Sequence, residues 1–318
     1  MRILVIGAGA LGGYFGGRLA AAGRDVTFLV RPARAEALRQ AGLVIRSACG
    51  DLTLRDPKIV TEAALRASGQ PFDLILLGCK AYDLDSAMTA LAPAVGPATL
   101  ILPFLNGMKH LNALQQRFGA QAVLGGVCMI GATLNAQREI VHLNRQHTLV
   151  FGELGGGMTE RLRAVSAALG ASGEPAGFEA RASSQIVRDM WEKWALLATL
   201  AGSTCLFRAP TGDIVASPDG AAVIERMLAE CCAVAAHNGF AMSEAFIANA
   251  RAMLLPPSGK RTASMLRDVQ TGARVEADQI LGDLIARGGP AQQTAGELTL
   301  LRIAYSQLKA YEAGLQKK

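Results

Sequence analysis

The sequence predicts an α/β domain over residues 1–181, followed by an all-α domain over residues 182–318. Two observations lead to this prediction. A glycine-rich turn, Gly7-Ala-Gly-Ala-Leu-Gly12, directly follows an apolar strand, and strand-like segments no longer occur beyond about residue 181. A chain of 318 residues is long enough for two domains of this size.

The glycine-rich turn lies inside a complete βαβ pattern. The pattern predicts a buried strand over Ile3–Ile6, a helix over Leu11–Ala22 that Gly23 ends, and a second strand over Asp25–Val30. In this motif the first glycine permits a sharp turn, the second lets the backbone approach a pyrophosphate, and the third lets the helix pack on the strand. The helix N-terminus then favours phosphate charge. The pattern therefore predicts a Rossmann-type dinucleotide-binding domain.

Arginines follow the second strand, where NAD-selective sites usually carry Asp or Glu. Arg31 and Arg34 occupy this stretch, and a guanidinium suits a 2′-phosphate, so the sequence favours NADP(H). Two further polar residues end later strands of the predicted sheet, Lys80 after 71–77 and Asn106 after 99–105. Ligands bind at this edge of open α/β sheets. The predicted cofactor-binding residues are Gly7, Gly9, Ala10, Leu11, Gly12, Arg31, Lys80 and Asn106.

The rest of the first domain follows from periodicity and turn residues. A short helix over 35–40 precedes a small hairpin formed by 43–46 and 51–54. Further helices are predicted over 83–92 and 159–169, and the segments 121–129, 139–144 and 147–152 are predicted to form antiparallel strands that close the domain.

The second domain is predicted to consist of helices alone. A helix runs from about residue 185 to 200, another starts at the N-cap Ser217-Pro218 and ends at Asn238-Gly239, and Ser243 caps a third. Residues 261–286 are predicted to form one long helix, closed by Gly288-Gly289-Pro290, and Thr294 with Glu297 form a capping box for the last helix. A substrate cleft is expected between the two domains.

Composition limits the possible partners. The net charge of +6 is modest, and no run of Lys and Arg is interleaved with aromatic residues, so anionic small molecules are favoured over nucleic acid. No uninterrupted apolar run reaches the length of a membrane span. Six cysteines without a C-x-x-C pair predict reduced thiols in a cytoplasmic protein, and four histidines without metal-ligand spacing predict no metal site. The helices 221–236 and 298–308 could form a homodimer surface, although core packing is the commoner use of such faces.

Few residues in the helical half could supply a proton to a reduced carbonyl. Lys193 lies among Trp191, Trp194 and apolar residues, where partial desolvation could lower its pKa towards a useful range. On the predicted long helix, Asp268 and Glu276 are about two turns apart. The alternatives are a snorkelling surface lysine and a surface salt bridge, and composition by itself favours both.

The order of these residues resembles ketopantoate reductase (2-dehydropantoate 2-reductase). The matching segments are Gly7–Gly12, Arg31, Lys80-Ala81, Asn106-Gly107-Met108, Trp191-Glu-Lys193, Ser264-Met-Leu-Arg-Asp268 and Glu276, and they span nearly the whole chain. The resemblance implies NADPH-dependent reduction of 2-dehydropantoate to pantoate, a step of pantothenate biosynthesis.

The resemblance also implies residue roles. Lys193 would be the general acid, Glu276 would hold Lys193 or the substrate hydroxyl, and Asn106 would position the reacting end. Substrate would contact Ser264, Arg261 and Asp268, with Ser264 on the carboxylate.

Three positions depart from the family pattern. Leu197 and Ala201, one and two turns after Lys193, and Arg261, three residues before Ser264, stand where the family typically has asparagines. Lost amides cost recognition, although an arginine can still bind a carboxylate. Asp83 is a fourth departure, near the expected 2′-phosphate, and it bears on the NADP(H) prediction instead of the substrate. The departures at Leu197, Ala201 and Arg261 predict a different or more apolar 2-keto acid.

Two alternatives remain at this point. A β-hydroxyacid-dehydrogenase-like enzyme has a similar layout and also uses a lysine, but the order of Ser264 and Glu276 disfavours it. A non-catalytic NADP(H)-binding sensor would keep the glycine turn and need neither Lys193 nor Glu276.

Overall fold

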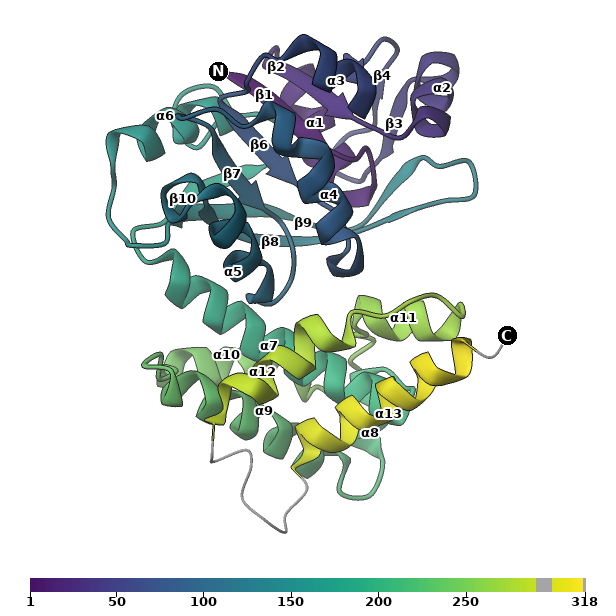
Figure 1. Ribbon diagram of the computed structural model, residues 1–318. Coiled ribbons are helices and arrows are strands. Elements are labelled where there is room, and N and C mark those ends of the chain that lie inside the picture. The colour runs from purple at the N-terminus through teal and green to yellow at the C-terminus, as the bar shows by residue number, and fades with distance from the viewer. Residues whose placement is uncertain (290–298, 317–318) are drawn as a thin grey trace. The chain divides into compact units, whose positions relative to one another are not determined.

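The computed structural model describes residues 1–289 and 299–316, and the chain forms two compact units (Figure 1). The first unit comprises residues 1–105 and 110–187, and the second comprises residues 106–109 and 188–318. The short segment Asn106–Lys109 therefore belongs to the helical unit, although it lies between a strand and a helix of the first unit in the sequence.

The first unit has two sheets and the helices that cover them. Its strands are β1 (Arg2–Ile6), β2 (Asp25–Leu29), β3 (Leu43–Arg46), β4 (Leu52–Leu54), β5 (Ile59–Val60), β6 (Leu74–Leu77), β7 (Leu100–Pro103), β8 (Leu124–Leu134), β9 (Ile140–Glu153) and β10 (Glu179–Ala182). Its helices are α1 (Ala10–Ala21), α2 (Pro32–Ala41), α3 (Glu62–Ser68), α4 (Leu84–Leu91), α5 (Lys109–Phe118) and α6 (Glu160–Leu169), with short turns η1 (Ala81–Asp83), η2 (Ala92–Ala94) and η3 (Ala120–Ala122).

The first sheet is parallel throughout, in the order β5-β2-β1-β6-β7. Strands β1, β6 and β7 are almost completely buried, as their continuous apolar sequences require. The chain order reverses between β1 and β6, so the loops after these two strands meet at the edge where doubly wound sheets bind ligands. This sheet confirms the predicted Rossmann-type fold.

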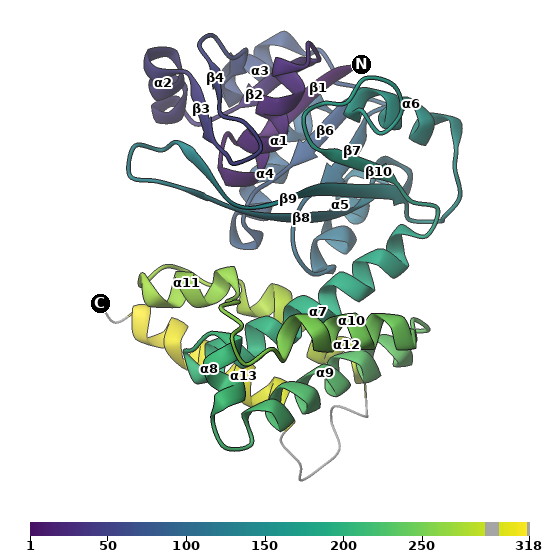
Figure 2. The same cartoon turned by 180° about the vertical axis from the view of Figure 1, so that it is seen from behind.

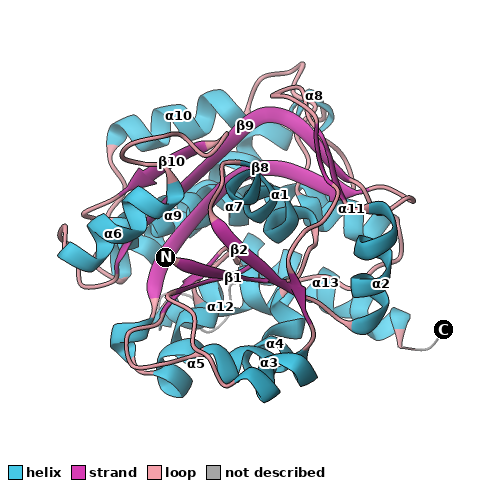
Figure 3. Cartoon of the chain, turned by 90° about the horizontal axis from the view of Figure 1, so that it is seen from above, coloured by secondary structure: helices cyan, strands magenta, loops and turns pink. Residues whose placement is uncertain are grey.

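Helix α1 packs against both sheets of the unit, and four glycines make this possible (Figure 3). A Cβ at Gly16 would lie 2.7 Å from Phe28 of the first sheet, whereas a Cβ at Gly17 would lie 2.7 Å from Leu43 of the second. Gly12 and Gly13 repeat this division one turn earlier. The pairs Gly12-Gly13 and Gly16-Gly17 therefore let one helix approach a sheet on each side.

The second sheet is mixed. Its order is β10-β9-β3-β4, and β8 pairs with β9 as a long antiparallel ribbon (Figure 2). The antiparallel pairing and the β3–β4 hairpin agree with the prediction. The division of β9 into two strands was wrong, because Ile140–Glu153 is one continuous strand. The strand β9 also pairs in parallel with β3 and β10, which local alternation could not reveal.

An ion pair between a buried carboxylate and a partly exposed arginine joins the end of β9 to the start of α6. Glu153, 6% exposed, accepts bonds from Arg161 Nε at 2.7 Å and from Arg161 Nη2 at 2.5 Å. It also accepts a bond from the hydroxyl of Thr159, the N-cap of α6, at 2.6 Å. The hydrogen bonds from Arg161 hold the pKa of the Glu153 carboxyl below its ordinary value.

This ion pair predicts an acid-dependent loss of stability. Because the folded-state pKa of Glu153 is depressed, its contribution is fully present above the unfolded pKa of 4.5 and is lost as the pH falls through the folded pKa. We expect Glu153→Gln to lower the free energy of unfolding at pH 7 by about 1–3 kcal/mol and to flatten its decline on the acid side. Urea titrations at several pH values measure both effects. Glu62→Gln, which breaks an exposed i,i+4 pair with Arg66, is the control and should change stability by at most about 0.5 kcal/mol. Equal losses in the two variants would contradict the prediction.

All the regular secondary structure among the described residues of the second unit is helical. Its helices are α7 (Ile186–Phe207, whose first two residues belong to the first unit), α8 (Thr211–Ala216), α9 (Gly220–His237), α10 (Glu244–Leu254), α11 (Ser264–Gln270), the π-helical turn η4 (Asp278–Gly282), α12 (Asp283–Arg287) and α13 (Leu300–Leu315). Helix α7 approaches α9 and α13 closely at Gly202, where a Cβ would lie 3.1 Å from Met227 and 3.7 Å from Ala304. Buried Glu230 of α9 accepts the N–H groups of Leu300 and Leu301 at the start of α13.

Two helix predictions in this unit were wrong. The long helix over 261–286 is broken, because α11 ends at Gln270 and Gly272 adopts φ +72°. Helix α9 begins at Gly220 with Asp219 as its N-cap, while the Ser217 hydroxyl donates to Ile214 O and so belongs to the end of α8. Ser243 does cap α10, since its hydroxyl accepts from Phe246 N. The proposed capping box at Thr294 and Glu297, and Pro290, lie outside the described residues. Among the helices that are described, none combines the length and the apolarity that crossing a membrane requires.

Candidate active site

The glycine turn between β1 and α1 has the geometry that its sequence predicts. Gly7 adopts φ +84°, a conformation that favours glycine, and a Cβ at Gly12 would lie 2.4 Å from Gly7 O. At Gly9, by contrast, a Cβ would meet no atom within 4 Å. The backbone at Gly9 is therefore open to a pyrophosphate, while Gly12 is needed for the packing of the turn itself.

The start of α1 supplies donors for phosphate oxygens. Gly9 is the N-cap, and the helix opens with Ala10 and Leu11, whose N–H groups have no acceptor within an α-helix. A Cβ at Gly78, just after β6, would lie 3.1 Å from Gly12 N, so the loop that leads to Lys80 packs directly against the turn. Lys80 is the residue before η1, at the same edge of the sheet.

The two arginines after β2 have different roles. The Arg31 side chain is 80% exposed and lies 3.8 Å from Asp83, a separation at which an exposed pair adds little stability. Arg34 instead donates to Ala8 O at 3.1 Å and to Arg138 O at 3.3 Å, and burial lowers the pKa of its guanidinium. Arg34 therefore supports the glycine turn, and Arg31 is the one available to a ligand.

In the second unit, Lys193 and Asn106 are directly bonded. Lys193 Nζ donates to Asn106 Oδ1 at 2.9 Å, and both side chains are half-buried. Lys193 comes from α7, whereas Asn106 comes from the short segment that follows β7. Two residues that are 87 positions apart in the sequence therefore form one polar pair.

The position of Asn106 is fixed by its neighbours. Gln279 Nε2 donates to Asn106 O at 2.7 Å, and Gln279 is 5% exposed. Gly107 adopts φ +72° and approaches Gln279 O so closely that a Cβ would lie 2.6 Å from it. Two contacts with Gln279 thus fix the backbone of Asn106 and Gly107, and with it the position from which the Asn106 side chain extends. Sequence analysis missed Gln279, and its place three residues after Glu276 was the signal that could have suggested it.

The tryptophans beside Lys193 are core residues. Trp191 and Trp194 are 2% and 1% exposed, and their rings stack with centroids 5.1 Å apart. Trp194 Nε1 donates to Ile280 O at 2.9 Å, one residue after Gln279. The tryptophans therefore connect the turn of α7 that carries Lys193 to the segment that holds Asn106.

The other predicted residues are spread over two segments. Glu276 is 9% exposed and precedes η4, and its carbonyl accepts Ile280 N at 3.0 Å. Ser264 is the first residue of α11, Asp268 lies on the same helix, and Arg261 is exposed in the loop before it. The prediction that Asp268 and Glu276 lie two turns apart on one helix was wrong. Helix α11 ends at Gln270, and Gly272, with a positive φ, follows before Glu276. Asp268 O instead accepts Ala273 N at 2.8 Å and the Tyr311 hydroxyl at 3.4 Å.

Comparison with known proteins agrees with this arrangement. Two family descriptions match, "Ketopantoate reductase PanE/ApbA" over residues 3–156 and its C-terminal counterpart over residues 185–312. A Bacillus subtilis protein named "Uncharacterized oxidoreductase YkpB" is 37% identical over 313 residues, which cover 98% of this chain and 99% of that one. The chain belongs to the ketopantoate reductase family. It is accordingly an NADP-dependent oxidoreductase, as the resemblance implied.

More distant members of the ketopantoate reductase family have a named reaction. A 2-dehydropantoate 2-reductase from Halobacterium salinarum is 28% identical, over 90% of this chain and 92% of that one. The crystal structure of a 2-dehydropantoate 2-reductase from Geobacter metallireducens superposes with a TM-score of 0.85 at 27% identity, over 98% of this chain and 99% of that one. The two-domain fold is therefore the fold of the family.

Proposed function

We propose that this member of the ketopantoate reductase family reduces a small 2-keto acid, formally 2-dehydropantoate, to the 2-hydroxy acid with NADPH. The observation that carries the proposal is the bond of 2.9 Å between Lys193 Nζ and Asn106 Oδ1. A half-buried lysine whose ammonium group is oriented by the side-chain oxygen of Asn106 is suited to protonate a developing alkoxide.

In the proposed reaction each residue acts on a stated atom. The chemistry that NADPH would supply when bound is the hydride that reduces C2 of the keto acid. Lys193 Nζ gives a proton to the C2 oxygen, and Asn106 Oδ1 orients the ammonium group by accepting one of its hydrogens. Glu276 holds Lys193 or the new hydroxyl, and Ser264 with Arg261 binds the carboxylate. Gln279 has a positioning role through the carbonyl of Asn106.

Cofactor selection is assigned to Arg31. Its exposed guanidinium can bind the 2′-phosphate of NADPH, which NADH lacks. We expect Arg31→Ala to raise KM for NADPH by about 10- to 100-fold, the range of a charge-assisted hydrogen bond, and to leave KM for NADH unchanged. Steady-state kinetics with both cofactors measure the effect, and Arg39→Ala, an exposed arginine of the same helix, is the matched control. A similar rise for both cofactors would rule out this role.

The substrate side chain is assigned to α7. Leu197 is half-buried and Ala201 is completely buried, one and two turns after Lys193. Neither side chain can hydrogen-bond a substrate hydroxyl. A site without such a partner discriminates only weakly between a substrate that carries the hydroxyl and one that lacks it. We therefore propose that the preferred keto acid carries a more apolar side chain than 2-dehydropantoate does.

Consumption of NADPH with a panel of 2-keto acids tests this proposal. The panel includes 2-dehydropantoate, 2-oxoisovalerate and phenylglyoxylate, with the same measurements on Lys193→Ala. We expect the highest kcat/KM with an apolar member. A kcat/KM above about 10⁴ M⁻¹s⁻¹ for 2-dehydropantoate would contradict the altered preference but support the reaction. Tight NADPH binding without turnover of any keto acid would instead favour a sensor.

A further inference from the structure

Three side chains with metal-binding atoms meet on the second sheet of the first unit, away from the glycine turn. Cys49 lies in the turn between β3 and β4, and His142 and His147 lie on β9. One candidate ligand atom from each, a thiol sulfur and two imidazole nitrogens, lies within 4.8 Å of the others. Sequence spacing could not indicate this cluster, because the hairpin and β9 are far apart in the sequence and come together through the parallel pairing of β3 with β9.

The hydrogen bonds of His142 leave one ring nitrogen with a lone pair. His142 Nε2 lies 3.0 Å from Gln146 O, and a carbonyl can only accept, so Nε2 carries the ring proton. His142 Nδ1 is then an acceptor, and it faces the Ser47 hydroxyl at 2.8 Å and the Tyr14 hydroxyl at 3.4 Å. Metal-binding histidines have the same arrangement, in which the other nitrogen donates to a backbone carbonyl.

The second histidine shares a hydroxyl with the first. His147 Nδ1 lies 2.7 Å from the Tyr14 hydroxyl, and the two imidazole rings stack with centroids 5.6 Å apart. The Tyr14 hydroxyl has one proton, so it can donate to only one of the two rings. The Tyr14 oxygen lies 2.7 Å from His147 Nδ1 and 3.4 Å from His142 Nδ1. It is close enough to both histidines to act as a fourth metal ligand, or to bind a water molecule that does so.

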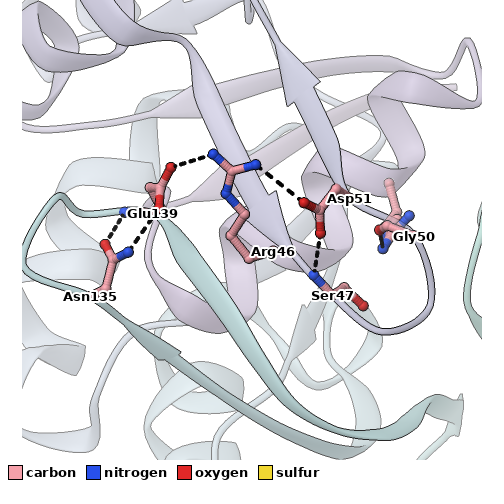
Figure 4. Close-up of polar contacts among 7 residues, drawn as sticks. Arg46, Ser47, Gly50, Asp51, Asn135 and Glu139 are labelled. Carbon is pink, nitrogen blue, oxygen red and sulfur yellow. Dashed lines mark hydrogen bonds and ion pairs between the residues drawn. The ribbon is translucent and has the colours of Figure 1, made fainter.

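The turn that carries Cys49 is fixed against β9 by an ionic network (Figure 4). Arg46 donates to Asp51 at 3.2 Å and to Glu139, just before β9, at 2.9 Å. Asp51 also accepts Ser47 N at 2.8 Å, and Asn135 holds the second oxygen of Glu139. These contacts place the turn that carries Cys49 beside the start of β9, and Cys49 itself is half-buried.

We propose that Cys49, His142 and His147 form a zinc site that joins the β3–β4 turn to strand β9. A thiolate with two imidazoles is a ligand set typical of Zn²⁺, which bonds sulfur at about 2.3 Å and nitrogen at about 2.0–2.1 Å. Ligands around one such ion are closer together than 4.8 Å, so Cys49 and His147, the two half-buried members, move inward on binding. The Cys49 thiol loses its proton to solvent as the metal–sulfur bond forms.

Titration of the metal-free protein with Co²⁺, followed by displacement with Zn²⁺, tests the site. A thiolate–cobalt charge-transfer band that saturates at one ion per chain is expected for the wild type, together with a higher midpoint of thermal unfolding in Zn²⁺. Cys49→Ser should lose the band completely, and His147→Gln should weaken binding at least tenfold, because even the loss of a residue that only orients a metal ligand usually costs about 10- to 100-fold in affinity.

Matched variants separate this site from other metal-binding groups. Cys232→Ser removes another half-buried thiol, one whose pKa burial raises to about 11, and His237→Gln removes an exposed histidine. Both should keep the band and the thermal shift. Circular dichroism shows whether each variant is folded. Cys49→Ser changes one atom of a half-buried side chain in a turn, so this variant is expected to fold like the wild type. No band in the wild type, or a band that survives Cys49→Ser, would overturn the proposal.

Discussion

Lys193→Ala is expected to lower kcat/KM for keto-acid reduction by about 10²- to 10⁴-fold, the usual contribution of a general acid. The substitution removes the ammonium group that Asn106 Oδ1 orients at 2.9 Å, while the glycine turn and Arg31, which belong to the other unit, are unchanged. The Kd for NADPH should therefore stay within about twofold of the wild-type value. A twofold change is far smaller than the tenfold change in Kd that a loss of about 1.4 kcal/mol of binding free energy would produce.

Two further measurements make this prediction specific to proton transfer. Small primary amines added to Lys193→Ala should restore part of the activity, because they can supply the missing proton, and they should not stimulate the wild type. Lys58→Ala is the control and should leave kcat/KM unchanged. It removes an exposed lysine that pairs with Asp25 at the amino ends of the parallel strands, whereas the glycine turn lies at their carboxyl ends. Full activity of Lys193→Ala would refute the proposed mechanism, and a loss of NADPH binding equal to the loss of activity would assign Lys193 to cofactor binding.

Substitutions in the glycine turn should separate packing from ligand binding. At Gly12 an added Cβ meets the carbonyl oxygen of Gly7 at 2.4 Å, and a backbone atom cannot move away cheaply. We expect Gly12→Ala to lower the free energy of unfolding by about 1–3 kcal/mol, the usual cost of overpacking, and to abolish measurable NADPH binding. At Gly9 an added Cβ meets nothing within 4 Å. Gly9→Ala should therefore keep wild-type stability and lose affinity for NADPH, because the methyl group fills the space for the pyrophosphate.

Denaturant unfolding without cofactor and fluorescence titration with NADPH measure the two quantities separately. Gly314→Ala, where a Cβ also meets no neighbour, is a control that should leave NADPH affinity unchanged and raise the free energy of unfolding by at most about 1 kcal/mol, because alanine is the better helix former in α13. If Gly9→Ala binds NADPH with wild-type affinity, the pyrophosphate does not approach the turn at this residue.

The parts of the fold that sequence predicted well are those with short-range causes. The strand β1, the glycine turn and α1 follow from an apolar run, three glycines and helical periodicity within about 20 residues. The cap at Ser243 follows from one side chain and one N–H group. Lys193 and Asn106 were predicted as separate candidates, by resemblance and by position at a strand end, and the bond between them became visible only in the structure.

The errors have a common physical origin in contacts that are distant in the sequence. Residues 261–286 keep an amphipathic pattern through Gly272, so periodicity predicted one helix, whereas Tyr311 of α13 binds Asp268 O and Ala273 O on either side of the break. The same holds for Gln279, whose role depends on a carbonyl 173 residues away. It also holds for Cys49, which lies near the histidines because β3 pairs with β9, a strand about 95 residues later in the chain.

The assignment of residues 106–109 to the helical unit limits how this protein can be divided or recombined. A fragment that begins at Arg188 would contain Lys193, Glu276 and Gln279 but would lack the Asn106 amide that Lys193 and Gln279 both contact. Grafting the helices onto another nucleotide-binding domain would exchange that amide for a foreign loop. The C-terminal half therefore cannot be transferred to another nucleotide-binding domain without residues 106–109. Under the proposed function, substrate specificity is expected to change by point substitutions on α7, at positions such as Leu197 and Ala201, and not by exchange of the whole half.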